Sequence, residues 1–332
     1  MKSITAGKAL LFFGLVAAGV FLAGAAVQAQ TEFPTHPINL WVGLPPGGSA
    51  DVLARALAEA AEKGLGQKIV VVNKAGGGGA VAASLLTKEK PDGYTLLLTT
   101  DTAITRAPHL SQLQYDPFND FDHFLIVAQW KTVWTVKKDS PFKTWPDLVN
   151  WAKKNPGQLT FGHCSASSFY FGMVKIAKLE GFTFRSVPYA CDGPTMTAVL
   201  GGHVQVGGGT AAPYRSHVLA NNVRILLADE KVAYAAGHGP QTTFKDLKYN
   251  FEVPLLAIIL APKNMPAPVK KTLEKALTEA LKSASLTKLA EDQEAVLLPV
   301  KGESYTDFLK KTSALYEELV KEAGLHKTQK KN

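Results

Sequence analysis

A glycine-rich turn between a strand pattern and a helix pattern is the feature that most constrains this chain. The run Leu44-Pro45-Pro46-Gly47-Gly48-Ser49-Ala50-Asp51 follows the apolar segment 38–42 and precedes the helix-forming segment 52–60. The first turn of such a helix carries free backbone N–H groups and the positive end of the helix dipole. Two glycines let the backbone approach a ligand closely, and Ser49 adds a hydroxyl. The turn therefore predicts an anion cradle suited to a carboxylate, with a simple helix cap as the alternative.

The N-terminal segment predicts an export signal. Lys2 and Lys8 form a basic region, residues 9–26 are apolar or small, and Val27-Gln28-Ala29 resembles a signal-peptidase site. We expect residues 1–29 to be a signal peptide and the mature protein to reach the periplasm, with an uncleaved membrane anchor as the alternative. No later segment of the sequence is long and apolar enough to span a bilayer.

Length and charge narrow the class of protein. A chain of 332 residues is too long for one ordinary core and suits two α/β domains. Loss of Lys2 and Lys8 with the signal peptide lowers the net charge from +8 to +6. Because the sequence has no dense basic stripe with interleaved aromatics, we expect no nucleic-acid partner. Residues 327–332 are expected to form a basic, flexible tail.

Strand and helix patterns alternate along the rest of the chain. This alternation predicts mainly parallel sheets with right-handed crossovers, in which ligands bind beyond the carboxyl ends of the strands. We expect strands at 38–42, 68–72, 94–99, 125–136, 159–162, 186–189, 204–207, 223–227 and 255–260, and helices at 52–60, 81–87, 145–154, from 167, at 194–200, 268–283, 285–291 and 304–323.

The two cysteines, Cys164 and Cys191, each follow a strand pattern. If the two strands are neighbours in a parallel sheet, the loops that follow them lie side by side. An oxidising compartment permits a disulfide between them, and two partly buried thiols are the alternative.

Several stretches resemble one family in their order and spacing. The chain is similar to the Bug/TctC-type extracytoplasmic solute receptors, the binding components of tripartite tricarboxylate transporters, over essentially the whole mature sequence. The matching stretches are Pro37-Ile38-Asn39-Leu40, Pro45 to Asp51, Leu65-Gly66-Gln67, Val72 to Gly79, Pro91 to Leu96, Tyr115-Asp116-Pro117, Pro156 to Leu159, Val187-Pro188-Tyr189, Leu200 to Val204 and Ala261-Pro262.

The resemblance implies an α/β fold of the periplasmic-binding-protein type. Such a fold has two lobes with mainly parallel mixed sheets, two crossovers and an inter-lobe cleft that closes on the ligand. Mapped onto this sequence, the first lobe comprises residues 30–129 and 253–326, and the second lobe comprises residues 130–252.

The resemblance also implies which residues bind the ligand in the first lobe. A ligand carboxylate is expected at the first cradle, held largely by backbone groups and bridging waters. Arg106 could pair with a second ligand carboxylate, although a surface arginine is the favoured interpretation. The candidate residues of this lobe are Pro46, Gly47, Gly48, Ser49, Ala50 and Asp51 of the cradle, and Thr100, Asp101 and Thr102 after the strand at 94–99.

In the second lobe, a Ser-rich loop before a helix forms a second cradle. Phe171-Gly172 stands where the family typically has a His-Leu pair, with Phe169 and Tyr170 before it. These aromatics imply a more aromatic pocket wall, with burial in the helix core as the alternative. The candidate residues are Ser165, Ala166, Ser167 and Ser168 of the second cradle, together with Tyr189 and Thr210.

Two further departures from the family pattern concern charge. The lysine of the usual Val-Pro-Tyr-Lys-Gly turn is absent after Tyr189, where Cys191 and Asp192 appear instead. Relatives often carry an acidic residue in the stretch that is Gly207-Gly208-Gly209-Thr210 here. Its replacement predicts the loss of a negative charge from the cleft.

The sequence offers no support for catalysis. His163 and Cys164 are adjacent, which rarely lets a thiol and an imidazole face each other, and no G-x-S-x-G elbow is present. The glycine run 76–79 lacks the G-K-[ST] of a P-loop, and the histidines lack metal-ligand spacing. We therefore expect no enzyme activity, no cofactor and no metal.

These observations predict a monomeric periplasmic receptor for an organic carboxylate, either aromatic or dicarboxylic, that delivers its ligand to the membrane permease of a tripartite transporter. The aromatic residues and the lost acidic residue favour an aromatic or bulky acid. A receptor that feeds a sensor or regulator through the same cleft is the alternative.

Overall fold

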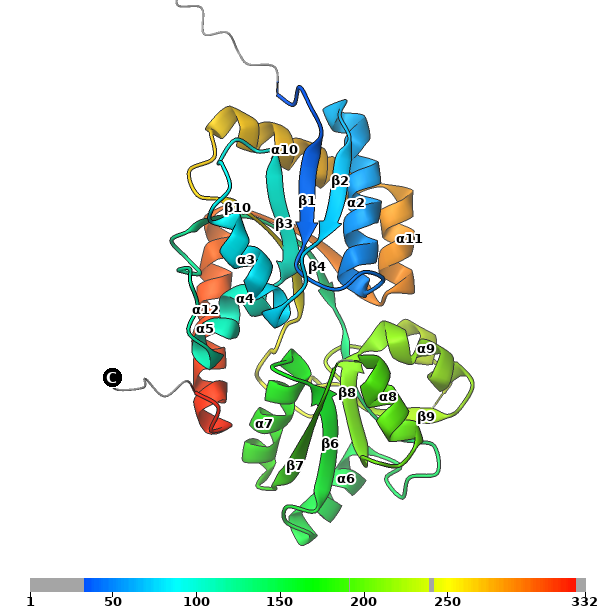
Figure 1. Cartoon of the computed structure of the whole chain (residues 1–332). Helices are drawn as coiled ribbons and strands as arrows, with labels where there is room; N and C mark the ends of the chain where they lie inside the picture. Colours follow the sequence, from blue (N-terminus) through cyan, green and yellow to red (C-terminus); the bar gives the residue numbers. More distant parts are fainter. Residues whose placement is uncertain (1–32, 191, 239–241, 327–332) are drawn as a thin grey trace, which may run out of the picture. The chain divides into compact units, whose positions relative to one another are not determined.

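The computed structural model describes residues 33–190, 192–238 and 242–326, which form two mixed sheets with helices packed against them (Figure 1). The predicted signal peptide 1–29, Cys191 and the predicted tail 327–332 lie outside the described residues. Within the described part, no helix combines the length and the apolar character needed to cross a membrane.

The first sheet has the strand order β11-β4-β10-β3-β1-β2. Strand β1 pairs in parallel with β2 and β3, whereas β10 pairs antiparallel with β3 and β4, and β11 pairs antiparallel with β4. The strands are β1 (Ile38–Val42), β2 (Ile69–Asn73), β3 (Thr95–Thr100), β4 (Phe121–Trp130), β10 (Leu256–Pro262) and β11 (Ala295–Val300).

The second sheet has the strand order β7-β6-β8-β5-β9. Strand β6 pairs in parallel with β7 and β8, and β5 pairs antiparallel with β8 and β9. The strands are β5 (Thr132–Lys137), β6 (Leu159–Cys164), β7 (Phe184–Tyr189), β8 (Val206–Thr210) and β9 (Val223–Ala228).

Helices cover the sheets. We call the first sheet with the helices on it the first unit, and the second sheet with its helices the second unit. In the first unit, α2 contacts β1 and β2, α10 and α11 pack on α2, and α3 packs on β3 (Figure 1). The helices are α2 (Ser49–Leu65), α3 (Ala80–Leu86), α4 (Thr102–Thr105), α5 (Ala107–Leu110), α6 (Trp145–Lys154), α7 (Ser168–Glu180), α8 (Asp192–Leu200), α9 (Ala211–Leu219), α10 (Ala267–Ala280), α11 (Ala284–Asp292) and α12 (Glu303–Glu322), with short 3-10 turns η1 (Gly77–Gly79) and η2 (Ala233–Ala235).

Local sequence explains the unit that carries the first cradle. Strand β1 is buried at every residue except Asn39, as expected for an inner strand of parallel pairs that is covered on both faces. Helix α2 buries an apolar stripe that includes Leu53 and Leu57. The α2 helix ends at Gly66, which adopts the left-handed conformation and donates its N–H to Glu62 O at 2.9 Å.

Most predicted elements are present, and the exceptions have physical reasons. The β-prone stretch 125–136 is two strands, β4 and β5, which belong to different sheets. The short helices α4 and α5, the helix α9 and the strand β11 were not predicted. Helix α9 buries only Ala211, Tyr214 and Val218, which lie on one face, and Pro213 stands within its nine residues, so its helical pattern is short and weak.

Two segments carry the chain between the sheets. The first crossover joins β4 to β5 at Lys131, and the second joins β9 to β10 through residues 229–255. The two-sheet, two-crossover α/β class is therefore confirmed, with antiparallel pairings made by the crossing strands β4, β5 and β10 and by the edge strand β11.

The second crossover is held by a buried ion pair. Asp101 and Arg106 are both fully buried, and Arg106 Nη2 donates to Asp101 Oδ1 at 3.0 Å. The same carboxylate oxygen accepts from Leu256 N at 3.1 Å, and Asp101 Oδ2 accepts from Thr105 Oγ1 at 2.9 Å. The interpretation of Arg106 as a surface arginine was therefore wrong, because its charge is neutralised inside the protein by a carboxylate that local sequence patterns do not assign to it.

Helix α12 contacts elements of both sheets. It packs on α4 and β4 of the first unit and on α7 of the second. Tyr316, Leu319 and Val320 join the hydrophobic cluster that contains Trp134 and Phe171. The predicted lobe boundaries, which assign all of residues 253–326 to the first lobe, stay a prediction.

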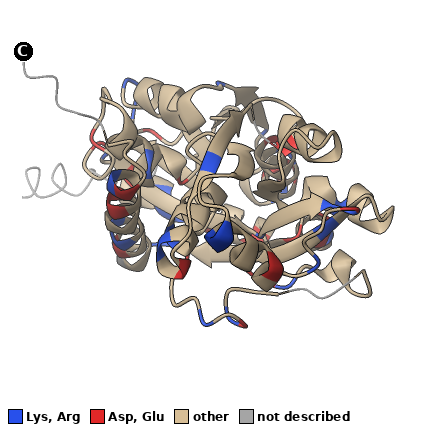
Figure 2. Ribbon diagram, turned by 90° about the horizontal axis from the view of Figure 1, so that it is seen from below, with Lys and Arg blue, Asp and Glu red and all other residues tan. Residues whose placement is uncertain are grey.

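Surface charges of both signs are intermingled. In the view of Figure 2, basic and acidic residues are both scattered over several elements and form no single basic stripe. Several are paired, as in Lys178–Glu322 at 2.6 Å and Lys153–Glu180 at 3.0 Å.

We predict that Asp101→Asn lowers the free energy of unfolding by about 3 kcal/mol, because it leaves the buried Arg106 without its counter-charge. Urea denaturation at pH 7 measures this loss. The control is Asp139→Asn, which removes an exposed pair with Lys137 and should change stability by less than about 0.5 kcal/mol. Equal losses in the two variants would contradict the structural role of the buried pair.

Candidate ligand-binding site

The first cradle lies at the carboxyl end of β1. Residues Pro46 to Gly48 are exposed, Gly47 has φ of 80°, and Ser49 is the first residue of α2. Gly48 is the N-cap, and no side chain caps the helix. Among the residues that the structure describes, no side chain therefore accepts from the first-turn amides of α2, as an anion site requires.

The carboxylate of Asp51 is turned into the protein. Asp51 Oδ2 accepts from Gly47 N at 2.9 Å and from Arg55 Nε at 3.1 Å. Asp51 Oδ1 accepts from Arg55 Nη2 at 3.0 Å and from Asn73 Nδ2 at 2.9 Å. Burial by itself raises the pKa of Asp51, but the hydrogen bonds from Arg55, Gly47 and Asn73 outweigh burial and lower it. Asp51 thus holds the loop in shape with its charge compensated.

A second strand end lies beside the first cradle. Because β1 and β3 are parallel neighbours, the turn after β3 shares an edge of the sheet with the cradle. The glycine run packs there, and a Cβ on Gly79 would lie 2.0 Å from Thr99 Oγ1, so only glycine fits. Thr100 and Thr102 are partly exposed at this turn, whereas Asp101 is fully buried.

The second cradle lies between β6 and α7. Ser165 is exposed, and Ala166 has φ of 56°. The hydroxyl of Ser167 accepts from Tyr170 N at 3.3 Å and caps α7, while Ser168 is fully buried. The hydroxyl of Ser167 is therefore engaged by its own helix, in contrast to the uncapped start of α2.

The aromatic residues after the second cradle belong to the core. Phe169, Tyr170 and Phe171 are all buried in one hydrophobic cluster, and Phe171 lies edge-on to Tyr316 of α12. Tyr170 stacks on His163 at 4.2 Å between ring centroids. Of the two alternatives for these residues, burial in the core is the correct one, so the expected aromatic pocket wall is not formed by them.

The loops after β6, β7 and β8 share one edge of the second sheet. The parallel register places Cys164 opposite Tyr189 and Gly162 opposite Gly207, which confirms that the loops after the two strands are neighbours. Cys164 is disulfide-bonded. Cys191 lies outside the described residues, so the bond between these two cysteines stays a prediction.

An acidic residue occupies the place beside the glycine stretch. Thr210 Oγ1 donates to Asp192 Oδ2 at 2.5 Å, and a Cβ on Gly209 would lie 2.8 Å from Asp192 Oδ1. Asp192 thus places a carboxyl next to Gly209, and the expected loss of a negative charge from the cleft stays a prediction. Burial raises the pKa of Asp192, and the hydrogen bond from Thr210 opposes this only in part.

The turn formed by Gln293 and Glu294 was not predicted from the sequence, and it lies next to the first crossover. Gln293 Nε2 donates to Ser49 O at 3.5 Å, and Gln293 Oε1 accepts from Trp130 Nε1 at 3.2 Å. The buried Glu294 accepts from Lys131 Nζ at 2.9 Å and from Tyr234 N at 3.1 Å. The partners of Gln293 and Glu294 are distant in sequence, so no local signal could have revealed them.

Within the described ranges, no hydrogen bond or ion pair joins the first cradle directly to the second, and no cluster of three or more potential metal ligands occurs. Each cradle is thus a separate set of donors on its own sheet edge. Tyr189 and Thr210 lie on the edge that carries the second cradle.

The architecture defines an α/β protein of the periplasmic-binding-protein class. Residues 53–325 match the tripartite tricarboxylate transporter family receptor, TctC. The chain therefore belongs to the TctC family, whose members are solute-binding receptors and not enzymes, and the predicted resemblance is confirmed.

Relatives and solved structures agree with this assignment. The chain is 30% identical to the UPF0065 protein in gbd 5'region of Cupriavidus necator over 321 residues, 95% of this chain and 97% of that protein. The periplasmic binding protein BugD is 25% identical with a TM-score of 0.75 over 89% of this chain and 100% of BugD. Rpa4515 of R. palustris, solved with adipate, is 23% identical with a TM-score of 0.77 over 88% of this chain and 98% of Rpa4515.

We predict that Asp51→Asn destabilises the protein by about 2 kcal/mol at pH 7, because the charge-assisted hydrogen bonds to Arg55 and Gly47 are weakened. The folded-state pKa of Asp51 is depressed, so its stabilisation is present above the unfolded-state pKa and is lost as the pH falls through the folded-state value. Urea unfolding should therefore show a smaller difference from wild type at pH 3 than at pH 7.

The control for this variant is Glu59→Gln, an exposed residue of the same helix, which should leave stability within about 0.5 kcal/mol of wild type at either pH. A deficit for Asp51→Asn that stays constant between the two pH values would show that the charge of Asp51 is not what holds the loop.

Proposed function

We propose that this protein is a periplasmic receptor that captures an organic carboxylate between the strand-end loops of its two α/β units and delivers it to the permease of a tripartite transporter. The observation that supports this proposal is the start of α2, where no side chain in the described part of the chain accepts from the first-turn amides. Backbone amides at a helix N-terminus bind carboxylates through charge-assisted hydrogen bonds.

The charge distribution at the first cradle supports an anionic ligand. The one carboxylate in the loop, Asp51, accepts hydrogen bonds from Arg55, Asn73 and Gly47 N, so its charge is compensated by groups of the protein. A ligand carboxylate at the start of α2 is therefore close to backbone amide donors and to Asp51, whose negative charge is already compensated. The proposed contacts in this unit are the backbone from Pro46 to Ala50, with Thr100 and Thr102 beside it.

In the second unit, the proposed contacts come from the edge shared by the loops after β6, β7 and β8. Ser165 and Ala166 supply backbone and hydroxyl groups, and Tyr189 and Thr210 lie along the same edge. Closure of the two units on the ligand stabilises the closed form only to the extent that the ligand binds that form better.

We infer that the ligand is an aliphatic dicarboxylate. The grounds for an aromatic or bulky acid were Phe169, Tyr170, Phe171 and the missing acidic residue. The three aromatics lie in the core, which removes the first of these grounds. A structure of the same fold holds adipate, which makes adipate a suitable probe.

We predict that adipate or another aliphatic dicarboxylate raises the melting temperature of the purified protein. At a ligand concentration of about 100 times Kd, binding stabilises the folded state by about 2.7 kcal/mol. Differential scanning fluorimetry against succinate, adipate, citrate, benzoate and glucose measures the shift. A shift with glucose and with no carboxylate would overturn the proposal, and a shift with benzoate alone would overturn the dicarboxylate assignment.

The site itself is tested by Ser49→Asp, which puts a fixed anion at the start of α2. Binding of the carboxylate found in the screen should be abolished while the circular dichroism spectrum is unchanged, because an acidic residue in a first helical turn is compatible with folding. The matched control is Ser285→Asp in the first turn of α11, which should bind like wild type. Unchanged affinity in Ser49→Asp would remove this loop from the binding site.

A further inference from the structure

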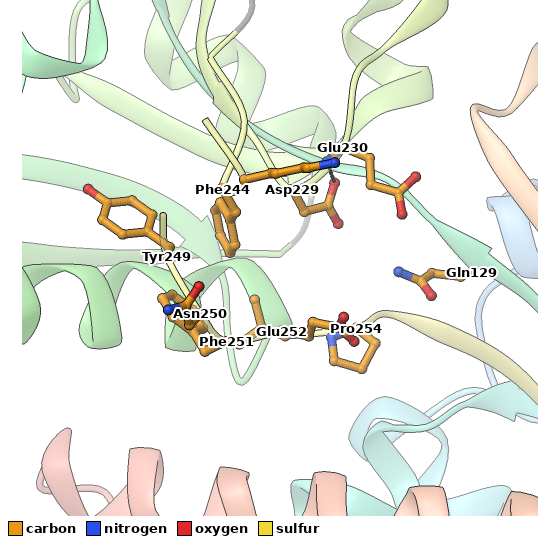
Figure 3. A pocket seen from close by; sticks show the side chains of 11 residues that line it. Gln129, Asp229, Glu230, Phe244, Tyr249, Asn250, Phe251, Glu252 and Pro254 are labelled. Carbon is orange, nitrogen blue, oxygen red and sulfur yellow. Dashed lines mark hydrogen bonds between the residues drawn. The ribbon is translucent and has the colours of Figure 1, made fainter. Parts of the chain in front are cut away.

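Side chains that bond to the main chain fix two strand ends of the second unit. At the end of β9, Asp229 Oδ1 accepts from Thr132 N and from Glu230 N, both at 2.8 Å, on the wall of a pocket at the second crossover (Figure 3). At the end of β6, the ring of His163 bonds in a comparable way to the main chain of Cys164. Because the turn that follows β6 is the second cradle, the contacts of His163 bear on the candidate ligand site.

The two ring nitrogens of the buried His163 have opposite roles. Nδ1 lies 2.9 Å from Cys164 O, and because a carbonyl oxygen only accepts, Nδ1 carries the proton and donates. Nε2 lies 2.7 Å from Ser186 Oγ and accepts from that hydroxyl, while the ring stacks on Tyr170. Burial lowers the pKa of His163 and outweighs the hydrogen bond with Cys164 O, so the ring is neutral at pH 7, as these roles require.

The hydrogen bond from His163 sets the direction of one peptide unit in the second cradle. The peptide between Cys164 and Ser165 is trans and planar, so its C=O and its N–H point in opposite directions. Because the oxygen of Cys164 faces the buried imidazole, the N–H of Ser165 faces the exposed side of the turn. Among the residues that the structure describes, none accepts a hydrogen bond from Ser165 N, so this donor is available to an acceptor from outside.

The backbone of this turn is strained and needs a restraint. Ala166 has φ of 56°, in the left-handed region that favours glycine or asparagine over alanine. The turn is closed by Ser167 N, which donates to Cys164 O at 3.3 Å, a long hydrogen bond. The bond from His163 to the same oxygen is the shorter of the two. The disulfide of Cys164 holds its side chain and leaves the direction of its carbonyl to these two donors.

We propose that His163 is a positioning residue, which directs the N–H of Ser165 toward a ligand carboxylate by holding the Cys164 carbonyl on the opposite side of the peptide. The inference rests on the proposed function, in which an organic carboxylate binds between the loops of the two units. An N–H that already has the right direction binds a carboxylate without the entropic cost of ordering the turn. The hydrogen bond that it then makes is charge-assisted.

Two substitutions at position 163 separate hydrogen bonding from packing. His163→Asn keeps a donor close to the position of Nδ1, because Nδ2 of asparagine is likewise bonded to Cγ, but it removes the ring. His163→Phe keeps an aromatic ring beside Tyr170 and removes the donor. Both variants lose the contact with Ser186, so the difference between them reports on the hydrogen bond to Cys164 O.

Isothermal titration with adipate at pH 7 compares the variants. We expect a Kd within about threefold of wild type for His163→Asn and at least about tenfold weaker binding for His163→Phe, the effect of losing one charge-assisted hydrogen bond. A packing role for the ring predicts the opposite order. Equal affinities of the two variants, or tighter binding by His163→Phe, would overturn the inference. The control His203→Gln, at an exposed histidine of the same unit, should bind like wild type.

A measurement without ligand keeps this inference distinguishable from the proposed function. The ¹⁵N NMR spectrum of the histidine rings at pH 7 reports the tautomer of His163, whose signals are assigned by their loss in His163→Asn. We expect a protonated Nδ1 and an unprotonated Nε2, and a proton on Nε2 would overturn the positioning role. If the tautomer is as expected and wild type does not bind adipate, the dicarboxylate function fails and the role of the Ser165 amide fails with it. If adipate binds and the two variants rank in the opposite order, this inference alone fails.

Discussion

The buried pair of Asp101 and Arg106 is the interaction on which the joining of the two units depends. It lies at the turn after β3, the same strand end that lines the first cradle, and it holds the start of β10 through Leu256 N. Arg106 also lies over the ring of Tyr316, whose hydroxyl donates to Pro254 O at 3.2 Å. The pair of Asp101 and Arg106 thus contacts the end of the second crossover and α12, and it belongs itself to the candidate ligand loop after β3.

The first crossover is tied in a comparable way by Gln293 and Glu294. Glu294 accepts from Lys131 and from Tyr234 N, and the hydroxyl of Tyr234 in turn donates to Ala211 O at the start of α9. Through Gln293 the same turn contacts Ser49 at the start of α2. Hydrogen bonds therefore connect the helix start of the first cradle with the helix start that follows Thr210, although the two cradles share no direct bond within the described ranges.

Sequence patterns predicted those helices and strands whose ends are set by residues close by in the sequence. Helix α6 begins at the capping box of Thr144 and Asp147 and ends before Asn155-Pro156-Gly157, and its bounds agree with the sequence. The turn of Pro46 to Asp51 could be placed between β1 and α2 for the same reason. The pair of Asp51 and Arg55 has the i,i+4 spacing that a sequence can reveal. The contact of Asp51 with Asn73, and the packing of Arg106 and Phe171 against Tyr316, could not be predicted, because these partners are distant in sequence and meet through tertiary packing.

The orientation of the Asp51 carboxylate toward the protein resolves an apparent contradiction in the first cradle. An acidic residue in the first turn stabilises a helix, but a free carboxylate there would repel an anionic ligand. Arg55, one turn later, and Asn73, on the neighbouring strand, bind that carboxylate and leave its charge compensated. The helix keeps its stabilising acid, Gly47 is held by it, and the amides beyond Gly48 remain open to an anion from outside.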